Sequence, residues 1–164
     1  MIRQRKIELL APAKNLECGI AAIDHGADAV YIGAPRFGAR AAAGNSLDDI
    51  AELVKYAHLY NVRIYVTLNT ILKDEELPET EKMIWDLYKV GVDALIVQDM
   101  GLLSLNLPPI PLHASTQMVI TGYDGAKLLE ELGVERVVTS RELQLDEIKE
   151  ITSHTNLEIE SFVH

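Results

Sequence analysis

The sequence predicts an α/β fold, an incomplete TIM-type (β/α) barrel of about seven parallel strands alternating with helices. Strand-like apolar runs alternate with amphipathic helical segments along all 164 residues. Residues 26–33, 91–98 and 133–140 form an internal repeat, in which a glycine ends a helix, an acidic residue follows and a buried strand comes next. No Gly-x-Gly-x-x-Gly follows the first strand, which weakens the alternative of an open dinucleotide-binding sheet.

Each element has its own signal. Residues 7–11 form the first strand, which Pro12 stops, and Asn15 caps a helix that runs to about residue 24. Ser46 caps the next helix, whose apolar residues recur at helical spacing. A stretch of buried strand ending in polar side chains, residues 111–117, is the central feature. The other predicted strands are 29–32, 62–68, 94–97, 136–139 and 157–163, and the other helices are about 78–90, a short one to 107, 126–132 and one around 145–151.

Composition excludes several classes of protein. The 25 acidic residues outnumber the 15 basic ones and give a net charge of −10, which argues against free-standing nucleic-acid binding. No apolar run approaches the roughly 20 residues of a membrane span, and no signal-peptide core follows the basic N-terminus, so we expect a cytoplasmic protein without membrane contact. The single cysteine, Cys18, excludes a disulfide framework and a cysteine-only metal cluster within this chain.

The C-terminal ends of barrel strands converge on one face, where β/α enzymes bind their ligands. Polar side chains follow several of the predicted strands, and two arginines lie in the loop after the second strand. This mixed-charge mouth suits a small carboxylate-bearing metabolite, because arginine binds carboxylates through two parallel hydrogen bonds. The candidate ligand-binding residues are Arg36, Arg40, Asn69, Gln98, Asp99, His113, Ser115, Gln117, Arg141, Glu142 and His164.

Three of these residues have alternative interpretations. Asp99 could cap the short helix that follows it, Glu142 could pair with Arg141, and His113 could be a hydrogen-bonded interior histidine. The sequence has no His-Glu-x-x-His zinc motif and no Gly-x-Ser-x-Gly nucleophile motif, so it predicts no metal site and assigns no catalytic residue.

Several segments together resemble the N-terminal part of the collagenase-like peptidase family, whose members were long classed as peptidases of unknown catalytic type. The segments are 8–13 (ELLAPA), 26–33 (GADAVYIG), 37–40 (FGAR), 65–69 (YVTLN), 91–99 (GVDALIVQD), 113–117 (HASTQ) and 141–143 (REL). Residues 44–47 (GNSL), 70–72 (TIL) and 107–110 (LPPI) are most similar to the branch that hydroxylates a cytidine in large-subunit ribosomal RNA.

The resemblance implies a barrel domain that serves RNA-base hydroxylation with an iron–sulfur cluster and prephenate or a related metabolite. The family signature continues from Glu160 into cysteines, so residues 1–164 are expected to be the N-terminal portion of one barrel domain, without a cofactor of their own and inactive alone. RNA binding is then expected only with the missing C-terminal part. The alternatives are a collagenase-like peptidase and a non-catalytic scaffold fragment. Unpaired first and last strands predict a homodimer through open sheet edges.

Overall fold

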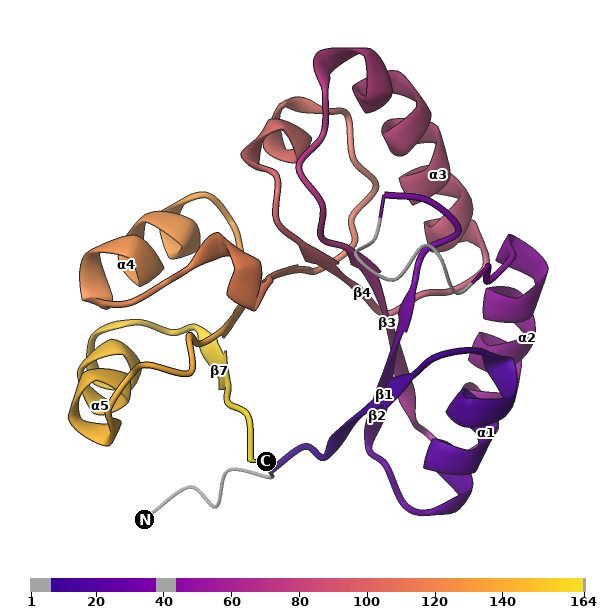
Figure 1. Ribbon diagram of the computed structural model, residues 1–164, viewed down its shortest axis with the longest axis horizontal. Coiled ribbons are helices and arrows are strands. Elements are labelled where there is room, and N and C mark those ends of the chain that lie inside the picture. The colour runs from indigo at the N-terminus through magenta and orange to yellow at the C-terminus, as the bar shows by residue number, and fades with distance from the viewer. Residues whose placement is uncertain (1–6, 38–43, 164) are drawn as a thin grey trace.

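A computed structural model describes residues 7–37 and 44–163. Its strands form one parallel sheet in the order β1-β2-β3-β4-β5-β6-β7, which confirms the predicted topology. Figure 1 shows this sheet curled into a partial barrel with the helices on its outside. The strands are β1 (Leu10–Ala13), β2 (Ala29–Gly33), β3 (Arg63–Leu68), β4 (Ala94–Val97), β5 (Leu112–Ala114), β6 (Arg136–Val138) and β7 (Glu158–Glu160).

Helices α1 and α2 begin at the caps that the sequence predicts, whereas α4 begins at Tyr123, before the predicted start at residue 126. The Asn15 side chain accepts a hydrogen bond from the Cys18 N–H at the start of α1, and Ser46 and Asp49 form a capping box at the start of α2. No helix within residues 7–37 and 44–163 has the length and apolarity needed to cross a bilayer. The helices are α1 (Leu16–Asp24), α2 (Leu47–Leu59), α3 (Leu77–Lys89), α4 (Tyr123–Glu131) and α5 (Leu145–His154), with 3₁₀ turns η2 (Asp74–Glu76), η3 (Met100–Ser104) and η4 (Thr116–Met118).

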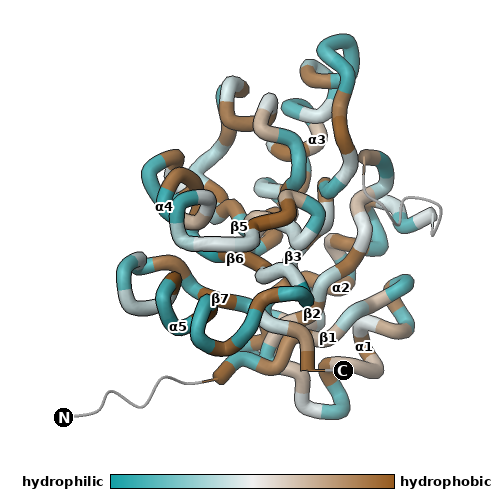
Figure 2. The backbone as a smooth tube through the Cα atoms, turned by 60° about the vertical axis from the view of Figure 1, so that its left-hand side comes forward, coloured by the Kyte–Doolittle hydropathy of each residue, from teal (hydrophilic) through white to brown (hydrophobic). Residues whose placement is uncertain are grey.

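The sheet has an apolar outer face and a mixed inner face. Alternate residues such as Val30, Ile64 and Val66 pack outward against the helices, whereas Ala29 and Tyr65 belong to a small separate cluster on the inner side. Figure 2 shows that the tube of α5, on the outside of the sheet, is mostly hydrophilic. The inner face of the sheet therefore combines small, aromatic and polar side chains, so functional groups can lie inside the partial barrel.

Two hydrophobic cores lie under the helices. The larger core joins β1–β4 to α1, α2 and α3 and contains Ile50, Leu53 and Ile84 among its fully buried members. The smaller core joins β5–β7 to α4 and α5 around Leu129 and Ile151. The sheet is thus continuous, but its outer packing is divided at β5, where Leu112 belongs to the larger core and Ala114 to the smaller one.

The structure differs from the sequence predictions mainly at element ends. β1 runs through Pro12 instead of stopping there, because β1 pairs only with β2 among the described strands and a proline is tolerated on an edge strand. The short helix predicted before residue 107 is the 3₁₀ turn η3, and β7 is shorter than the predicted strand.

Candidate functional site

The predicted candidates lie mostly just beyond the C-terminal ends of strands. Asn69 follows β3, Gln98 follows β4, Ser115 follows β5, and Arg141 and Glu142 lie beyond β6. Since all seven strands are parallel, these ends share one edge of the curled sheet. Arg40 and His164 lie outside the described residues.

Three candidates are used in local structure. The Asp99 carboxylate accepts hydrogen bonds from the N–H groups of Leu72 (2.8 Å) and Gly101 (2.7 Å), so the alternative role as a cap of η3 is confirmed. The Ser115 hydroxyl accepts from the N–H of Gln117 at 3.2 Å. Arg36 forms an ion pair with Glu79 at the start of α3.

Arg141 is the candidate whose side chain is most available to bind a ligand. Its guanidinium lies 4.2 Å from the ring centroid of Phe162, which follows β7. The Thr139 hydroxyl donates to the backbone oxygen of Glu160 and so holds the ends of β6 and β7 together below this pair. Within residues 44–163, Arg141 forms no ion pair with Glu142, and both side chains are exposed. Stacking occupies one face of the guanidinium and leaves the N–H groups at its edge able to bind an oxyanion.

His113 lies inside the barrel and not at the strand tips. It is the middle residue of β5, paired with Ile96 on one side and Arg136 on the other, and only 4% of it is exposed. Its ring meets the Tyr65 ring edge-on at a centroid distance of 4.8 Å. Burial, with the charges of Arg136 and Arg63 nearby, lowers the pKa of His113 to about 3. His113 is therefore a neutral interior imidazole, and its Nδ1 has no hydrogen-bond partner.

The inner face also holds a group of charges that we call the lumen ion cluster: Glu8, Arg63, Arg136, Glu158 and Glu160. Arg136 lies at its centre and is 7% exposed. Arg136 Nη1 donates to Glu8 Oε1 at 2.7 Å, and Arg136 Nε donates to Glu158 Oε2 at 3.0 Å. Glu8 also pairs with Arg63 and accepts a hydrogen bond from the Tyr65 hydroxyl at 3.0 Å.

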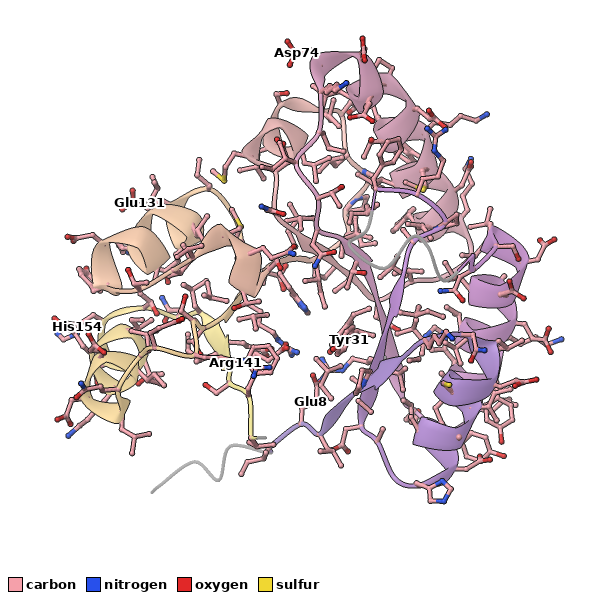
Figure 3. The ribbon with its side chains drawn as sticks, viewed as in Figure 1. Glu8, Tyr31, Asp74, Glu131, Arg141 and His154 are labelled. Atoms are coloured by element: carbon pink, nitrogen blue, oxygen red, sulfur yellow. The ribbon has the colours of Figure 1, made fainter. Side chains whose placement is uncertain are left out.

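The cluster changes the ionisation of its members. Burial alone lowers the pKa of Arg136, but its hydrogen bonds to Glu8 and Glu158 outweigh burial and raise it. Burial raises the pKa of Glu160, against the opposing effect of Arg136, whose Nη1 lies 3.6 Å from Glu160 Oε2. Figure 3 shows Glu8 and Tyr31 on the inner side of the sheet with Arg141 facing them, while Asp74 and His154 lie on the outside.

Sequence reasoning missed the lumen ion cluster. The signal was present, because Arg136, Glu158 and Glu160 interrupt apolar strands at alternate positions, as inward-facing residues do. No group of three or more potential metal ligands occurs in the part of the chain that the structure describes.

The buried neutral His113 predicts a specific pH dependence of stability. Between pH 6.5 and about 3 the unfolded chain binds a proton that the folded chain does not, so stability falls as the pH falls through this window. His113→Phe should flatten this part of the curve, which urea unfolding at several pH values measures. Parallel curves for wild type and His113→Phe would contradict a neutral His113.

A curled parallel sheet with outer helices and polar residues at its strand tips defines a β/α-barrel domain of the TIM type. The chain belongs to peptidase family U32, whose profile matches residues 14–164.

Comparison with characterised proteins gives relatives that act on RNA. The chain is 55% identical to the 23S rRNA 5-hydroxycytidine C2501 synthase of Escherichia coli over 99% of its own length and 25% of that protein. It is 37% identical to tRNA hydroxylation protein P1 of Bacillus subtilis over 98% of its length and 39% of that protein. The chain therefore spans about a quarter to two-fifths of these relatives.

Solved structures support the fold. The U32 peptidase Mk0906 matches with a TM-score of 0.75 at 11% identity, over 96% of this chain and 70% of that one. Thiamine phosphate pyrophosphorylase from Pyrococcus furiosus matches with a TM-score of 0.65 at 12% identity, over 94% of this chain and 73% of that one. At such identities the likeness concerns the fold alone.

Proposed function

We propose that this chain is the barrel portion of an RNA-base hydroxylase that acts on a cytidine of large-subunit ribosomal RNA. The observation that carries the proposal is the 55% identity to the E. coli 5-hydroxycytidine synthase across nearly the whole chain. The tRNA hydroxylation protein of B. subtilis is a more distant relative over the same residues.

The proposed role of this portion is to position a small carboxylate-bearing metabolite at the strand tips. Arg141 is the residue we assign to that task, because its guanidinium lies over the Phe162 ring and forms no ion pair with the residues that the structure describes. The metabolite we propose is prephenate or a related carboxylate, because a guanidinium can bind a carboxylate through two parallel hydrogen bonds. Glu142 and Gln117, both exposed near the same edge, are the neighbouring groups we expect to contact the rest of the metabolite.

An iron–sulfur cluster does not fit the residues of this chain. Cluster iron is bound by several cysteine thiolates, and the one cysteine, Cys18, lies exposed on α1, outside the barrel mouth. In the proposed enzyme, the cluster would be bound by residues other than these 164.

A chimaeric protein tests the proposal. This chain replaces the matching N-terminal quarter of the E. coli synthase in a strain that lacks that enzyme, and mass spectrometry of nucleosides from 23S rRNA measures 5-hydroxycytidine. We expect the chimaera to restore the modification and this chain alone to leave it absent. Arg141→Ala in the chimaera should reduce the modification at least about tenfold, since a charged contact is lost, whereas Lys149→Ala on exposed α5 should not.

A chimaera that is expressed and folded but leaves the cytidine unmodified would refute the proposed function. The family name supports a second candidate, proteolysis. If the chimaera cleaves gelatin, and no single variant abolishes both this cleavage and the RNA modification, the two activities are separate. Cleavage without modification would favour the peptidase.

A further inference from the structure

Two side chains from neighbouring strand tips meet at the mouth of the barrel. Arg141 is the third residue after β6, and Phe162 is the second residue after β7. The guanidinium carbon of Arg141 lies 4.2 Å from the centroid of the Phe162 ring, within the range of a cation–π contact. Because 36% of Phe162 is exposed, its ring supports the guanidinium at the surface of the mouth and does not bury it.

The backbone below this contact is held in place by Thr139, which is 2% exposed. The N–H of Thr139 (3.0 Å) and its hydroxyl (3.2 Å) both donate to the backbone oxygen of Glu160. The same hydroxyl lies 3.2 Å from Ser161 Oγ. Thr139 comes two residues before Arg141, and Glu160 comes two residues before Phe162. These hydrogen bonds therefore fix the distance between the two strand tips directly below the contact.

The contact with Phe162 differs from an ion pair in the atoms that it occupies. A carboxylate partner would occupy the guanidinium N–H groups and compete with the carboxylate of a ligand. An aromatic ring contacts the face of the guanidinium, so the N–H groups along its edge stay available. Within the described residues Arg141 has no ion-pair partner, although Glu142 is its neighbour in the sequence. The ring thus restricts the arginine side chain without blocking its donors.

We propose that Phe162 is a positioning residue, which holds the Arg141 guanidinium in the orientation that binds the carboxylate of the metabolite. This role rests on the proposed function, in which Arg141 is the carboxylate ligand. An arginine side chain has many rotamers, and restricting them before binding reduces the entropy that is lost when the ligand binds. Phe162 therefore raises the affinity for the metabolite by acting through Arg141, and it needs no contact of its own with the ligand.

Calorimetry of prephenate binding to the whole chain tests this role. Phe162→Leu keeps an apolar side chain but removes the ring, and it should weaken binding about two- to fivefold, as expected for an exposed cation–π contact. Phe162→Tyr keeps the ring and should bind prephenate as the wild type does. Val163→Ala, at a neighbouring position that is 91% exposed, is the matched control and should also leave binding unchanged.

A double-mutant cycle with Arg141→Ala separates positioning from a purely structural role. Arg141→Ala alone should weaken binding at least about tenfold, and adding Phe162→Leu should weaken it no further. Wild-type affinity in Phe162→Leu, a loss in Phe162→Tyr equal to that in Phe162→Leu, or a full further loss in the double variant would each overturn the role of Phe162 and leave that of Arg141 intact.

Failure at Arg141 would be recognised separately. If the wild-type chain does not bind prephenate, or Arg141→Ala binds it as tightly as the wild type, the role assigned to Arg141 is wrong and that of Phe162 falls with it. The nucleoside analysis of the chimaera still decides independently whether the chain serves RNA hydroxylation.

Discussion

Arg136→Met is expected to lower the free energy of unfolding by about 3–5 kcal/mol, the cost of removing one partner from a buried ion pair. Arg136 is 7% exposed and neutralises Glu8 and Glu160, whose side chains are 15% and 21% exposed. Without the guanidinium, these carboxylates remain in the lumen without a counter-charge. Urea unfolding followed by circular dichroism at neutral pH measures the loss.

Two comparisons make this result specific. Arg63→Met removes a cluster member whose side chain is 51% exposed, so it should cost less than about 1 kcal/mol. Adding Glu8→Gln and Glu160→Gln to Arg136→Met should recover much of the lost stability, because the stranded charges are then gone. Equal losses of unfolding free energy in the Arg136 and Arg63 variants would mean that burial does not determine how much each arginine of the lumen ion cluster contributes to stability.

Leu53→Ala is expected to lower the free energy of unfolding by about 2–5 kcal/mol through the cavity it leaves. Leu53 is fully buried on α2 and lies directly against the backbone of α1 at Gly19, where even a methyl group would come within 2.6 Å of its Cδ1. The close approach leaves little room for the helices to collapse further. Thermal and urea unfolding of the purified variant measure the loss.

Leu59→Ala on the same helix is the matched control. The Leu59 side chain is 74% exposed, so its truncation should change the free energy of unfolding by no more than about 0.5 kcal/mol. A small effect of Leu53→Ala, comparable with that of Leu59→Ala, would contradict the packing of α1 on α2.

Local patterns in the sequence were sufficient to predict most of the fold. Asn15 and Ser46 mark helix starts because a cap needs only nearby backbone N–H groups, and both positions are confirmed. The repeated glycine before a buried strand is likewise local: Gly26, Gly91 and Gly133 all have positive φ, which favours glycine.

The inner face of the barrel was harder to predict, because its contacts join distant residues. His113 follows two prolines closely and precedes polar residues, so the sequence places it with the strand tips, but the register of β5 turns it inward beside Arg136. The ion pair between Arg136 and Glu8 joins residues that are 128 positions apart, so no local sequence pattern predicts it. Asp99 shows the opposite case, since its capping role depends on Gly101 two residues away and was foreseen.

The long separation between Glu8 and Arg136 has a consequence for synthesis on the ribosome. Strands β1–β4 share a core with α1–α3, and from β5 onward only Leu112 belongs to the buried members of this core, so most of its packing can form before the later strands emerge. Until β6 leaves the exit tunnel, Glu8 lacks its buried partner. We therefore expect the first half of the nascent chain to fold early. The N-terminal segment around Glu8 should become ordered only when Arg136 is available to pair with it.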